Sequence, residues 1–176
     1  MASKKEVWDW FKSIVIALII VIVVRTFLFT PVIVEGASMM PTLHNNERMM
    51  VTKVGDLERF DIVVFHANET ENYIKRVIGL PGDKIEYKND KLFINGKQYK
   101  EHYLAEYKKE LDSYGDTGPL TNNFTATVPN DTIFVMGDNR RKSMDSRHIG
   151  PISMDKVIGE TNIVFWPIED VKILGR

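Results

Sequence analysis

The sequence predicts a mainly β domain that follows a single apolar helix at the N-terminus. The helix is indicated by Ile14–Val24, IVIALIIVIVV, which contains no polar side chain. The β domain is indicated by short runs rich in β-branched and aromatic residues, which recur from residue 31 onward and are separated by turn residues. A chain of 176 residues has room for one such domain with an appendage.

The composition excludes several classes of site. The net charge is -1 and no basic patch with interleaved aromatic residues is present, so no nucleic-acid partner is expected. The chain has no cysteine, which excludes thiol nucleophiles, Cys-ligated zinc and disulfides. A folded domain outside the cytoplasm would therefore depend on its hydrophobic core alone.

The apolar run is predicted to extend over residues 11–29 as a transmembrane signal-anchor helix. At ~1.5 Å per residue this stretch spans about 28 Å, close to the hydrocarbon thickness of a bilayer. Trp8 and Trp10 precede it, as expected of an interfacial aromatic belt. A buried core helix is the weaker alternative, because the rest of the chain offers no helical partner. A cleaved secretory signal is also weaker, because no A-x-A-like site follows.

Lysines near the start of the chain indicate the orientation of this helix. Lys4, Lys5 and Lys12 lie at its N-terminal side, whereas residues 26–43 contain no lysine or arginine. The positive-inside rule then places residues 1–10 in the cytoplasm. Residues 30–176 are expected to form an extracytoplasmic, β-rich domain, with the lipid bilayer of the cell membrane as a partner.

Turn signals divide the domain into strands. Asn95-Gly96 and Pro81-Gly82 predict tight turns, the first within a β-ribbon over residues 84–98. Residues 101–123 are polar and are expected to be an exposed excursion between strands, with at most one or two helical turns over residues 105–111. The remaining strands are expected at residues 31–35, 48–53, 60–66, 72–78, 132–136 and 156–167, the last as a strand pair broken by Gly159.

Ser38 lies in the stretch VEGASMMPTL, where the backbone is unusually open. Gly36 and Ala37 precede it with almost no side-chain bulk, so a second chain can lie close. Met39 and Met40 follow it and offer an adaptable apolar surface for a substrate. Ser38 is thus a candidate nucleophile, although a serine needs a base to remove its proton. The same residues also fit an ordinary turn, which this segment alone favours.

A histidine base for Ser38 is not favoured by the sequence. The loop around His148 offers nearby Asp and Ser residues, but proximity in sequence does not supply a Ser-His-Asp geometry, and no G-x-S-x-G is present. His66 ends an apolar strand, which suggests a structural role. The two remaining histidines lie among turn or charged residues and are His44 and His102.

Lys75 is the other candidate base. In the expected strand over residues 72–78 it shares one face with Tyr73 and Val77, so its ammonium is partly desolvated. Desolvation lowers the pKa of a lysine towards neutrality. Arg76 cannot serve, because a guanidinium does not deprotonate in proteins. A lysine that snorkels from a half-exposed strand is the alternative, and periodicity alone favours it.

A third candidate segment is the polar loop over residues 137–150, which glycines bound at both ends. Asp145 and Arg147 are expected to pair and brace it, and a hydroxyl from Ser143 or Ser146 could orient another polar group. Several arginines and a lysine in the loop disfavour a calcium site. A solvated loop with a capped turn is the alternative.

Together the three segments resemble the conserved boxes of the type I signal peptidases, the bacterial leader peptidases that use a Ser-Lys dyad. SMMPTL from Ser38 is similar to the S-M-x-P-T-L box, and KRVIGLPGD from Lys75 to the K-R-x-x-G-x-P-G-D box. The loop from Gly137, with GDNR followed by Ser143, Asp145, Ser146 and Arg147, resembles G-D-N-R-x-x-S-x-D-S-R. The boxes occur in the family's order behind an N-terminal anchor, as in the small Gram-positive members such as those of Bacillus.

The resemblance implies a role for each candidate. Ser38 would be the nucleophile and its backbone N–H one oxyanion donor, and Lys75 would act as a neutral amine and general base. Ser143 would orient the lysine, and the ion pair of Asp145 and Arg147 would be structural. Many Gram-negative members place a second oxyanion donor, a serine hydroxyl, two residues before the nucleophile. That position is Gly36 here, so a second donor would be backbone or water.

The resemblance also implies a fold and a substrate. The family fold is two antiparallel β-sheets beside the membrane, and it is related to that of self-cleaving repressors. The substrates are secretory preproteins with small residues at positions -1 and -3 of the signal peptide, and no metal or cofactor is implied. One alternative is a self-cleaving repressor-type protease, which would need a DNA-binding head and a cytoplasmic location. Another is a catalytically inactive, membrane-tethered β-module that binds exported proteins.

Overall fold

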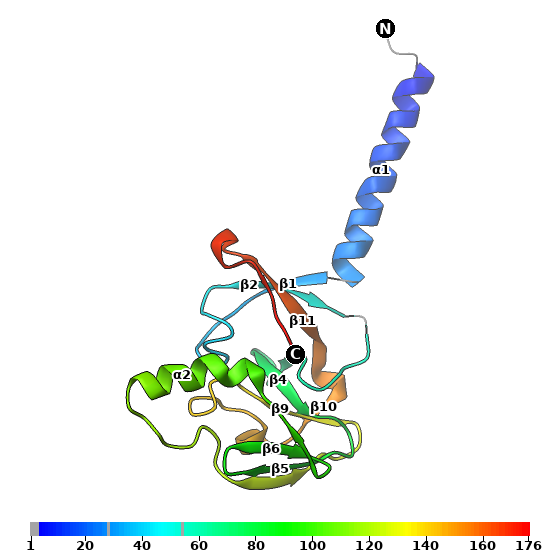
Figure 1. The fold of residues 1–176 in the computed structure, drawn as a ribbon. Coiled ribbons are helices and arrows are strands. Elements are labelled where there is room, and N and C mark those ends of the chain that lie inside the picture. The colour runs from blue at the N-terminus through cyan, green and yellow to red at the C-terminus, as the bar shows by residue number, and fades with distance from the viewer. Residues whose placement is uncertain (1–3, 28, 54) are drawn as a thin grey trace.

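The chain folds into one N-terminal helix and a β domain. The computed structural model describes residues 4–27, 29–53 and 55–176. Helix α1 (Lys4–Phe27) begins earlier than the expected helix, and it extends away from the β domain (Figure 1). Leu28, the penultimate residue of the expected helix, lies outside the described residues, and Phe29, its expected last residue, instead begins the first strand. Within the described ranges no helix combines the length and the apolar character that a membrane crossing needs. The crossing therefore stays a prediction.

The larger sheet carries the site described below. It has eight antiparallel strands in the order β1-β2-β11-β3-β4-β9-β10, with β12 paired to β11. The strands of this sheet are β1 (Phe29–Ile33), β2 (Arg48–Thr52), β3 (Ile62–His66), β4 (Asn72–Gly79), β9 (Thr132–Met136), β10 (Ile152–Ser153), β11 (Val157–Trp166) and β12 (Lys172–Ile173).

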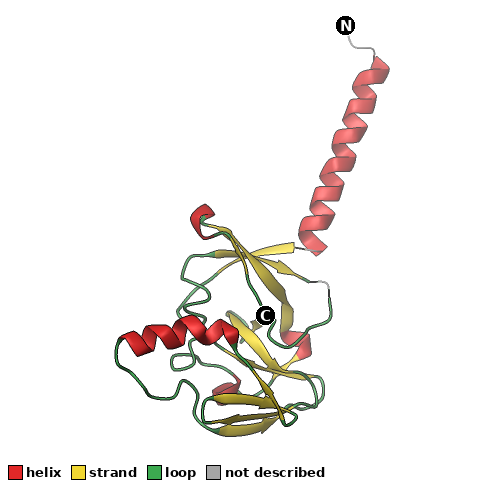
Figure 2. Cartoon of the chain, in the orientation of Figure 1, coloured by secondary structure: helices red, strands yellow, loops and turns green. Residues whose placement is uncertain are grey.

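The smaller sheet contains the expected ribbon. Its four antiparallel strands have the order β7-β6-β5-β8, and Figure 2 shows them as a separate layer below the larger sheet. Asn95 and Gly96 have φ values of 53° and 79°, the positive pair that a type I′ turn requires. Two antiparallel sheets are thus confirmed. The strands of this sheet are β5 (Lys84–Lys88), β6 (Lys91–Ile94), β7 (Lys97–Tyr99) and β8 (Phe124–Thr127).

Alternation along β4 joins three parts of the core. Ile74 packs with residues of β2, β3 and β11, and Val77 packs with β3 and β9. Ile78 points into a cluster that β4 and β9 share with β5 and β6 of the smaller sheet. β4 is buried on both faces from Ile74 to Gly79, and such a strand holds its side chains in fixed positions.

Two expectations about the chain path are corrected. Residues 156–167 do not form a strand pair, because β11 runs through Gly159 as one strand. A Cβ on Gly159 would overlap the carbonyl oxygen of Thr52, so the glycine allows a close approach of β2 and does not break β11. The excursion contains a longer helix than expected, α2 (Ala105–Ser113). The other short helices are η1 (His102–Leu104), α3 (Ser146–Ile149), η2 (Met154–Lys156) and η3 (Ile168–Asp170).

Candidate active site

Strand register brings two of the three candidate segments together. β4 pairs with β9 so that Arg76 lies opposite Met136. The polar loop starts at Gly137, the next residue, and therefore leaves β9 beside Lys75 and Arg76. The sequence distance between these segments is large, but the antiparallel pairing of β4 and β9 makes them neighbours.

The turn that carries Ser38 is fixed to the sheet by its own apolar residues. Val34, Met39 and Leu43 are buried in the cluster that includes Ile74 of β4. The backbone N–H of Val34 donates to Glu47 O at 2.8 Å, which continues the pairing of β1 and β2 beyond the strand ends. The nucleophile candidate is thus held against β4 on both its N-terminal and C-terminal sides.

Ser38 and Lys75 are in hydrogen-bond contact. Lys75 Nζ lies 2.8 Å from Ser38 Oγ and 2.9 Å from the carbonyl oxygen of Ile74. The lysine side chain is only 3% exposed, and its Nζ lies 4.9 Å from the centre of the Tyr73 ring. A neutral amine at this place can donate to Ile74 O and accept the hydroxyl proton of Ser38 with its lone pair.

Burial prepares Lys75 to accept a proton. Desolvation lowers its pKa from 10.5 to about 8, and the negative charge of Asp145 opposes this shift only in part. Among the described residues no carboxylate lies within ion-pair distance of Nζ. The arrangement can therefore deprotonate a serine hydroxyl near neutral pH without a histidine.

Ser143 lies next to the dyad but does not bond to the lysine in this structure. Its hydroxyl is buried and helps to lower the pKa of Asp145, but it forms no hydrogen bond of normal geometry within the described part of the chain. A Cβ added to Gly137 would overlap both the Ser143 side chain and the carbonyl oxygen of Ser38. Only glycine fits at this crossing of the loop and the Ser38 turn. An orienting role for Ser143 stays a prediction.

Asp145 and Arg147 form a bidentate ion pair. Arg147 Nε and Nη2 donate to the two carboxylate oxygens of Asp145 at 2.8 and 2.7 Å. Asp145 Oδ2 also accepts from the backbone N–H of Gly137 at 3.0 Å. Burial opposes the ionisation of Asp145, but the hydrogen bonds from Arg147 and Gly137 and the charge of Arg147 outweigh it, so the pKa of Asp145 is lowered. The pair thus fixes the start of the loop beside the dyad.

The structure adds a second, buried ion pair that sequence reasoning missed. Arg76 Nε and Nη2 donate to Asp138 at 2.9 and 2.7 Å, and both side chains are fully buried. Asp138 Oδ2 also accepts from the hydroxyl of Thr42 at 2.6 Å. Asp138 therefore ties β4 to the Ser38 turn. The GDNR box pointed to Asp138, but the local sequence did not predict that it pairs with Arg76 and Thr42.

Asn139 was also missed, and it contacts the nucleophile turn directly. Its backbone N–H donates to Ser38 O at 3.0 Å, and its side-chain Nδ2 donates to Ala37 O at 3.0 Å. Asn139 thus holds the Ala37 and Ser38 carbonyl groups, one on each side of the Ser38 Cα. The backbone around the nucleophile is fixed by the loop, not by the turn alone.

Gly36 offers no obvious second oxyanion donor. Its φ is 88°, a left-handed value that favours glycine, and a Cβ there would meet no atom within 4 Å. Its backbone N–H already donates to Asn45 Oδ1 at 3.0 Å. By contrast, no hydrogen bond found among the described residues uses the N–H of Ser38. The Ser38 N–H is therefore free to donate to a substrate.

The two methionines after Ser38 differ in exposure. Met39 is 2% exposed and belongs to the core, whereas Met40 is 37% exposed. Only Met40 is available to a substrate here, which narrows the expected apolar surface to one side chain.

Of the histidines, His44 lies 3.6 Å from Glu47 and His66 bonds to Asn72. Among the described residues the hydrogen-bond partner of the Ser38 hydroxyl is Lys75.

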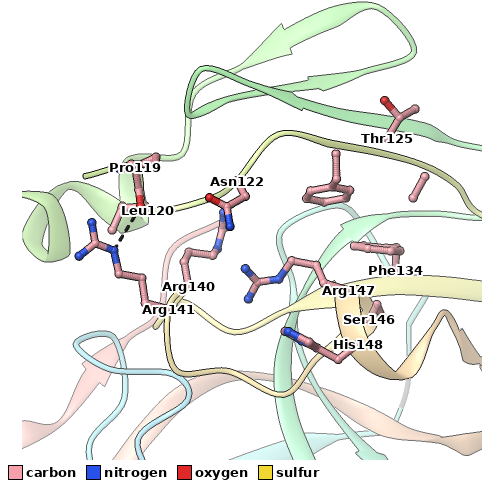
Figure 3. A pocket seen from close by; sticks show the side chains of 12 residues that line it. Pro119, Leu120, Asn122, Thr125, Phe134, Arg140, Arg141, Ser146, Arg147 and His148 are labelled. Atoms are coloured by element: carbon pink, nitrogen blue, oxygen red, sulfur yellow. Dashed lines mark hydrogen bonds between the residues drawn. The ribbon is translucent and has the colours of Figure 1, made fainter. Parts of the chain in front are cut away.

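A cavity of about 710 Å³ lies beside the loop but does not contain the dyad. Figure 3 shows Arg140, Arg141 and Arg147 around it, with His148 at one side. Each of the three arginines has a carboxylate partner, which for Arg147 is Asp145. The candidate chemistry therefore lies at the Ser38 turn and β4, outside this cavity.

A serine hydroxyl bonded to a buried lysine of lowered pKa is the arrangement of a Ser-Lys peptidase. Comparison with known proteins gives the family. The chain matches the family described as "Signal peptidase, peptidase S26" over residues 7–166, and it belongs to that family.

Similar proteins cover nearly the whole chain. It is 49% identical to "Signal peptidase I P" of Bacillus subtilis subsp. natto, over 97% of this chain and 95% of that protein. It is 42% identical to "Signal peptidase IB" of Staphylococcus aureus (strain COL), over 96% of this chain and 94% of that protein. A solved signal peptidase I from Enterococcus faecalis V583 is 37% identical and has a TM-score of 0.56. That match covers 61% of this chain and 97% of the other.

Proposed function

We propose that this chain is a serine endopeptidase that removes signal peptides from exported preproteins, with Ser38 as nucleophile and Lys75 as general base. The observation that carries the proposal is the 2.8 Å contact between Ser38 Oγ and a lysine whose pKa burial lowers to about 8. Membership of the signal peptidase family supplies the substrate class.

The proposed reaction has two halves. Lys75 accepts the hydroxyl proton as Ser38 Oγ attacks the scissile carbonyl, and the Ser38 N–H stabilises the oxyanion that forms. The Lys75 ammonium then gives its proton to the leaving amine, and an acyl-enzyme remains on Ser38. Lys75 next takes a proton from water as the water attacks the ester. The proton returns to Ser38 Oγ, and the signal peptide leaves with a free carboxylate.

Other residues support this dyad in the proposal. Ser143 orients Lys75, and its buried hydroxyl lies beside Gly137 at the crossing with the Ser38 turn. Asp145 and Arg147 fix the loop as a structural ion pair. Met40 contacts the substrate. The substrates carry small residues at positions -1 and -3, as the family resemblance implies.

The proposed enzyme is anchored in the cell membrane by α1, with residues 30–176 on the outer face. Residues 14–22 are apolar, and the side chains of the large ones are exposed on all sides of the helix, which is the pattern of a lipid-facing segment. The β11–β12 hairpin also exposes Trp166, Ile168 and Ile173. Figure 1 shows its η3 end and the C-terminal end of α1 at the same end of the domain. Protease added outside intact spheroplasts should digest residues 30–176, and protection of them would overturn this orientation.

The dyad is tested by Ser38→Ala and Lys75→Ala in the full-length protein. We expect each variant to lose at least about 10²-fold in cleavage of a synthetic signal-peptide substrate, because neither attack nor proton removal is then supported. Ser113→Ala and Lys91→Ala are matched controls, since both side chains are exposed. Full activity of either dyad variant would refute the assignment. Absence of cleavage by the wild type would instead favour an inactive β-module.

A further inference from the structure

The excursion over residues 101–123 is fastened to the loop that holds the Ser38 turn. Arg140 donates to Tyr87 OH at 2.8 Å and pairs with Glu101. Arg141 pairs with Asp116, and its Nε donates to Pro119 O at 3.2 Å (Figure 3). Two consecutive arginines of the loop therefore bind the excursion, one at its start and the other in its second half. A segment that served only as a mobile linker would not need such contacts.

Tyr107 of α2 makes a further buried contact between the excursion and the loop. Its ring packs with Leu104 and Leu120, and the residue is 8% exposed. Its hydroxyl donates to Asn139 Oδ1 at 2.9 Å. The hydrogen bond is buried, so neither group can exchange its partner for bulk water at low cost.

The amide of Asn139 can take only one orientation between its two partners. Its other end faces Ala37 O at 3.0 Å, and a carbonyl oxygen can only accept. The Asn139 Nδ2 must therefore point at Ala37, which leaves Oδ1 for the Tyr107 hydroxyl. Loss of the Tyr107 hydroxyl leaves Oδ1 without a partner and removes the bond that holds the amide from that side.

The orientation of the Ala37 carbonyl decides where the Ser38 N–H points. Both groups belong to the same planar peptide unit, and in a trans unit they point in opposite directions. A group that holds Ala37 O therefore also aims the Ser38 N–H. The backbone N–H of Met40 contacts Ala37 O as well, at 3.2 Å, so Asn139 shares this task and does not perform it alone.

We propose that Tyr107 and Asn139 are positioning residues that aim the Ser38 N–H at the oxyanion of the transition state. The excursion then acts on catalysis through the loop that holds the Ser38 turn. The inference rests on the proposed function, because it assumes that the Ser38 N–H is the oxyanion donor. It also explains how a site with glycine at position 36 keeps the Ser38 N–H in place.

The test compares Tyr107→Phe, Asn139→Ala and the double variant in the full-length protein. For Tyr107→Phe we expect kcat on a synthetic signal peptide to fall about tenfold with KM unchanged. This is less than the ~10²–10³-fold loss on removal of an oxyanion donor, because the donor remains. The inhibition constant of a substrate-like peptide aldehyde, whose adduct places an oxygen at the oxyanion position, should rise by the same factor. The affinity for a non-cleavable peptide should not change.

The double variant separates a positioning role from a merely structural one. If Tyr107 acts through Asn139, Tyr107→Phe should have no further effect on kcat in the Asn139→Ala background. Tyr114→Phe is the matched control, since this tyrosine lies in the same excursion and is exposed. The pH at which activity is half-maximal should be the same in all variants, because Lys75 is not in this chain of contacts.

Several results would overturn the inference. These are an unchanged kcat in Tyr107→Phe, equal losses in the presence and absence of Asn139, or a change in KM alone. An equal loss of aldehyde and peptide binding would also count against it, because it would report a general distortion. A wild-type protein that cleaves no signal peptide would refute the proposed function itself, whereas an active wild type with an unaffected Tyr107→Phe would refute only the positioning role.

Discussion

Lys75 and Arg76 are adjacent on β4 and both are buried, but they lie on opposite faces of the strand and have different partners. Lys75 is 3% exposed and Arg76 is 0% exposed. Arg76 has a bidentate partner in Asp138, at 2.9 and 2.7 Å. On the other face Lys75 contacts a hydroxyl and a carbonyl oxygen, and among the described residues it has no carboxylate partner at ion-pair distance.

The difference shows that a partner, not burial, decides what a buried cation can do. Burial disfavours the charged form of both side chains. A guanidinium cannot lose its proton, so Arg76 depends on Asp138 to remain buried. An ammonium can lose its proton, and without a partner the pKa of Lys75 falls to about 8. On the proposed mechanism, one face of β4 therefore serves structure and the other serves proton transfer.

The largest expected effect separates charge from proton acceptance. Lys75→Arg keeps a cation of similar length on the same face, but a guanidinium cannot act as a base. We expect kcat on a signal-peptide substrate to fall about 10³-fold, within the range typical of a lost general base. Circular dichroism and the affinity for a non-cleavable peptide provide the control for folding and binding. Activity within tenfold of the wild type would show that Lys75 acts only through its charge.

The next effect concerns stability. Arg76→Met leaves Asp138 buried without its cation and should lower the free energy of unfolding by about 3–5 kcal/mol. Lys75→Met, on the opposite face, removes a buried cation that has no carboxylate partner, so its stability at pH 7 should equal or exceed that of the wild type. Urea denaturation of the full-length chain in detergent measures both. A loss of similar size in the two variants would remove the distinction between the two faces.

The smallest effect is a pH dependence that belongs to Lys75. Only the neutral amine is a base, so kcat/KM should rise about tenfold per pH unit below pH 8 and reach a plateau above it. Stability should follow the same group. Because the pKa of Lys75 is lower in the folded state than the ordinary value of 10.5, the unfolded state binds more protons between about pH 8 and 10.5.

The wild type should therefore gain stability relative to Lys75→Met as the pH rises through this window. Below it, Lys75 is charged in both states and its desolvation cost is fully present. The other lysines contribute equally to both proteins, so subtracting the two unfolding free energies removes their contribution. Unfolding free energies of both proteins at pH 7 and pH 10 give the comparison. A difference that is the same at both values would contradict the lowered pKa.

Periodicity and turn chemistry made much of the sheet predictable. Tyr73, Lys75 and Val77 were expected on one face of a strand, and the Lys75 amine indeed lies over the Tyr73 ring. The turn at Asn95-Gly96 was predictable because its backbone angles depend on local residue type. Gly159 misled the same reasoning, since its purpose is the close approach of a distant strand, which local sequence does not contain.

The supports of the candidate site were less accessible to sequence reasoning. The contact between Ser38 and Lys75 was expected from a family resemblance, because residue spacing alone favoured a turn and a surface lysine. Asp138 meets Arg76 across 62 residues of chain, and Asn139 meets Ala37 across 102. Such pairings depend on the register of β4 and β9 and leave no periodic trace. The burial of Tyr107 in a polar segment was equally hidden.

The short junction between α1 and β1 has a consequence for substrate choice. α1 ends at Phe27, β1 begins at Phe29, and the nucleophile follows β1 by only five residues. Fully extended, the chain from Phe27 to Ser38 can reach no more than about 40 Å. On the anchoring proposed above, this tether works as a ruler, and a scissile bond is accepted only at the height above the bilayer that it allows. A preprotein would then be selected by the length of its signal peptide as well as by its side chains.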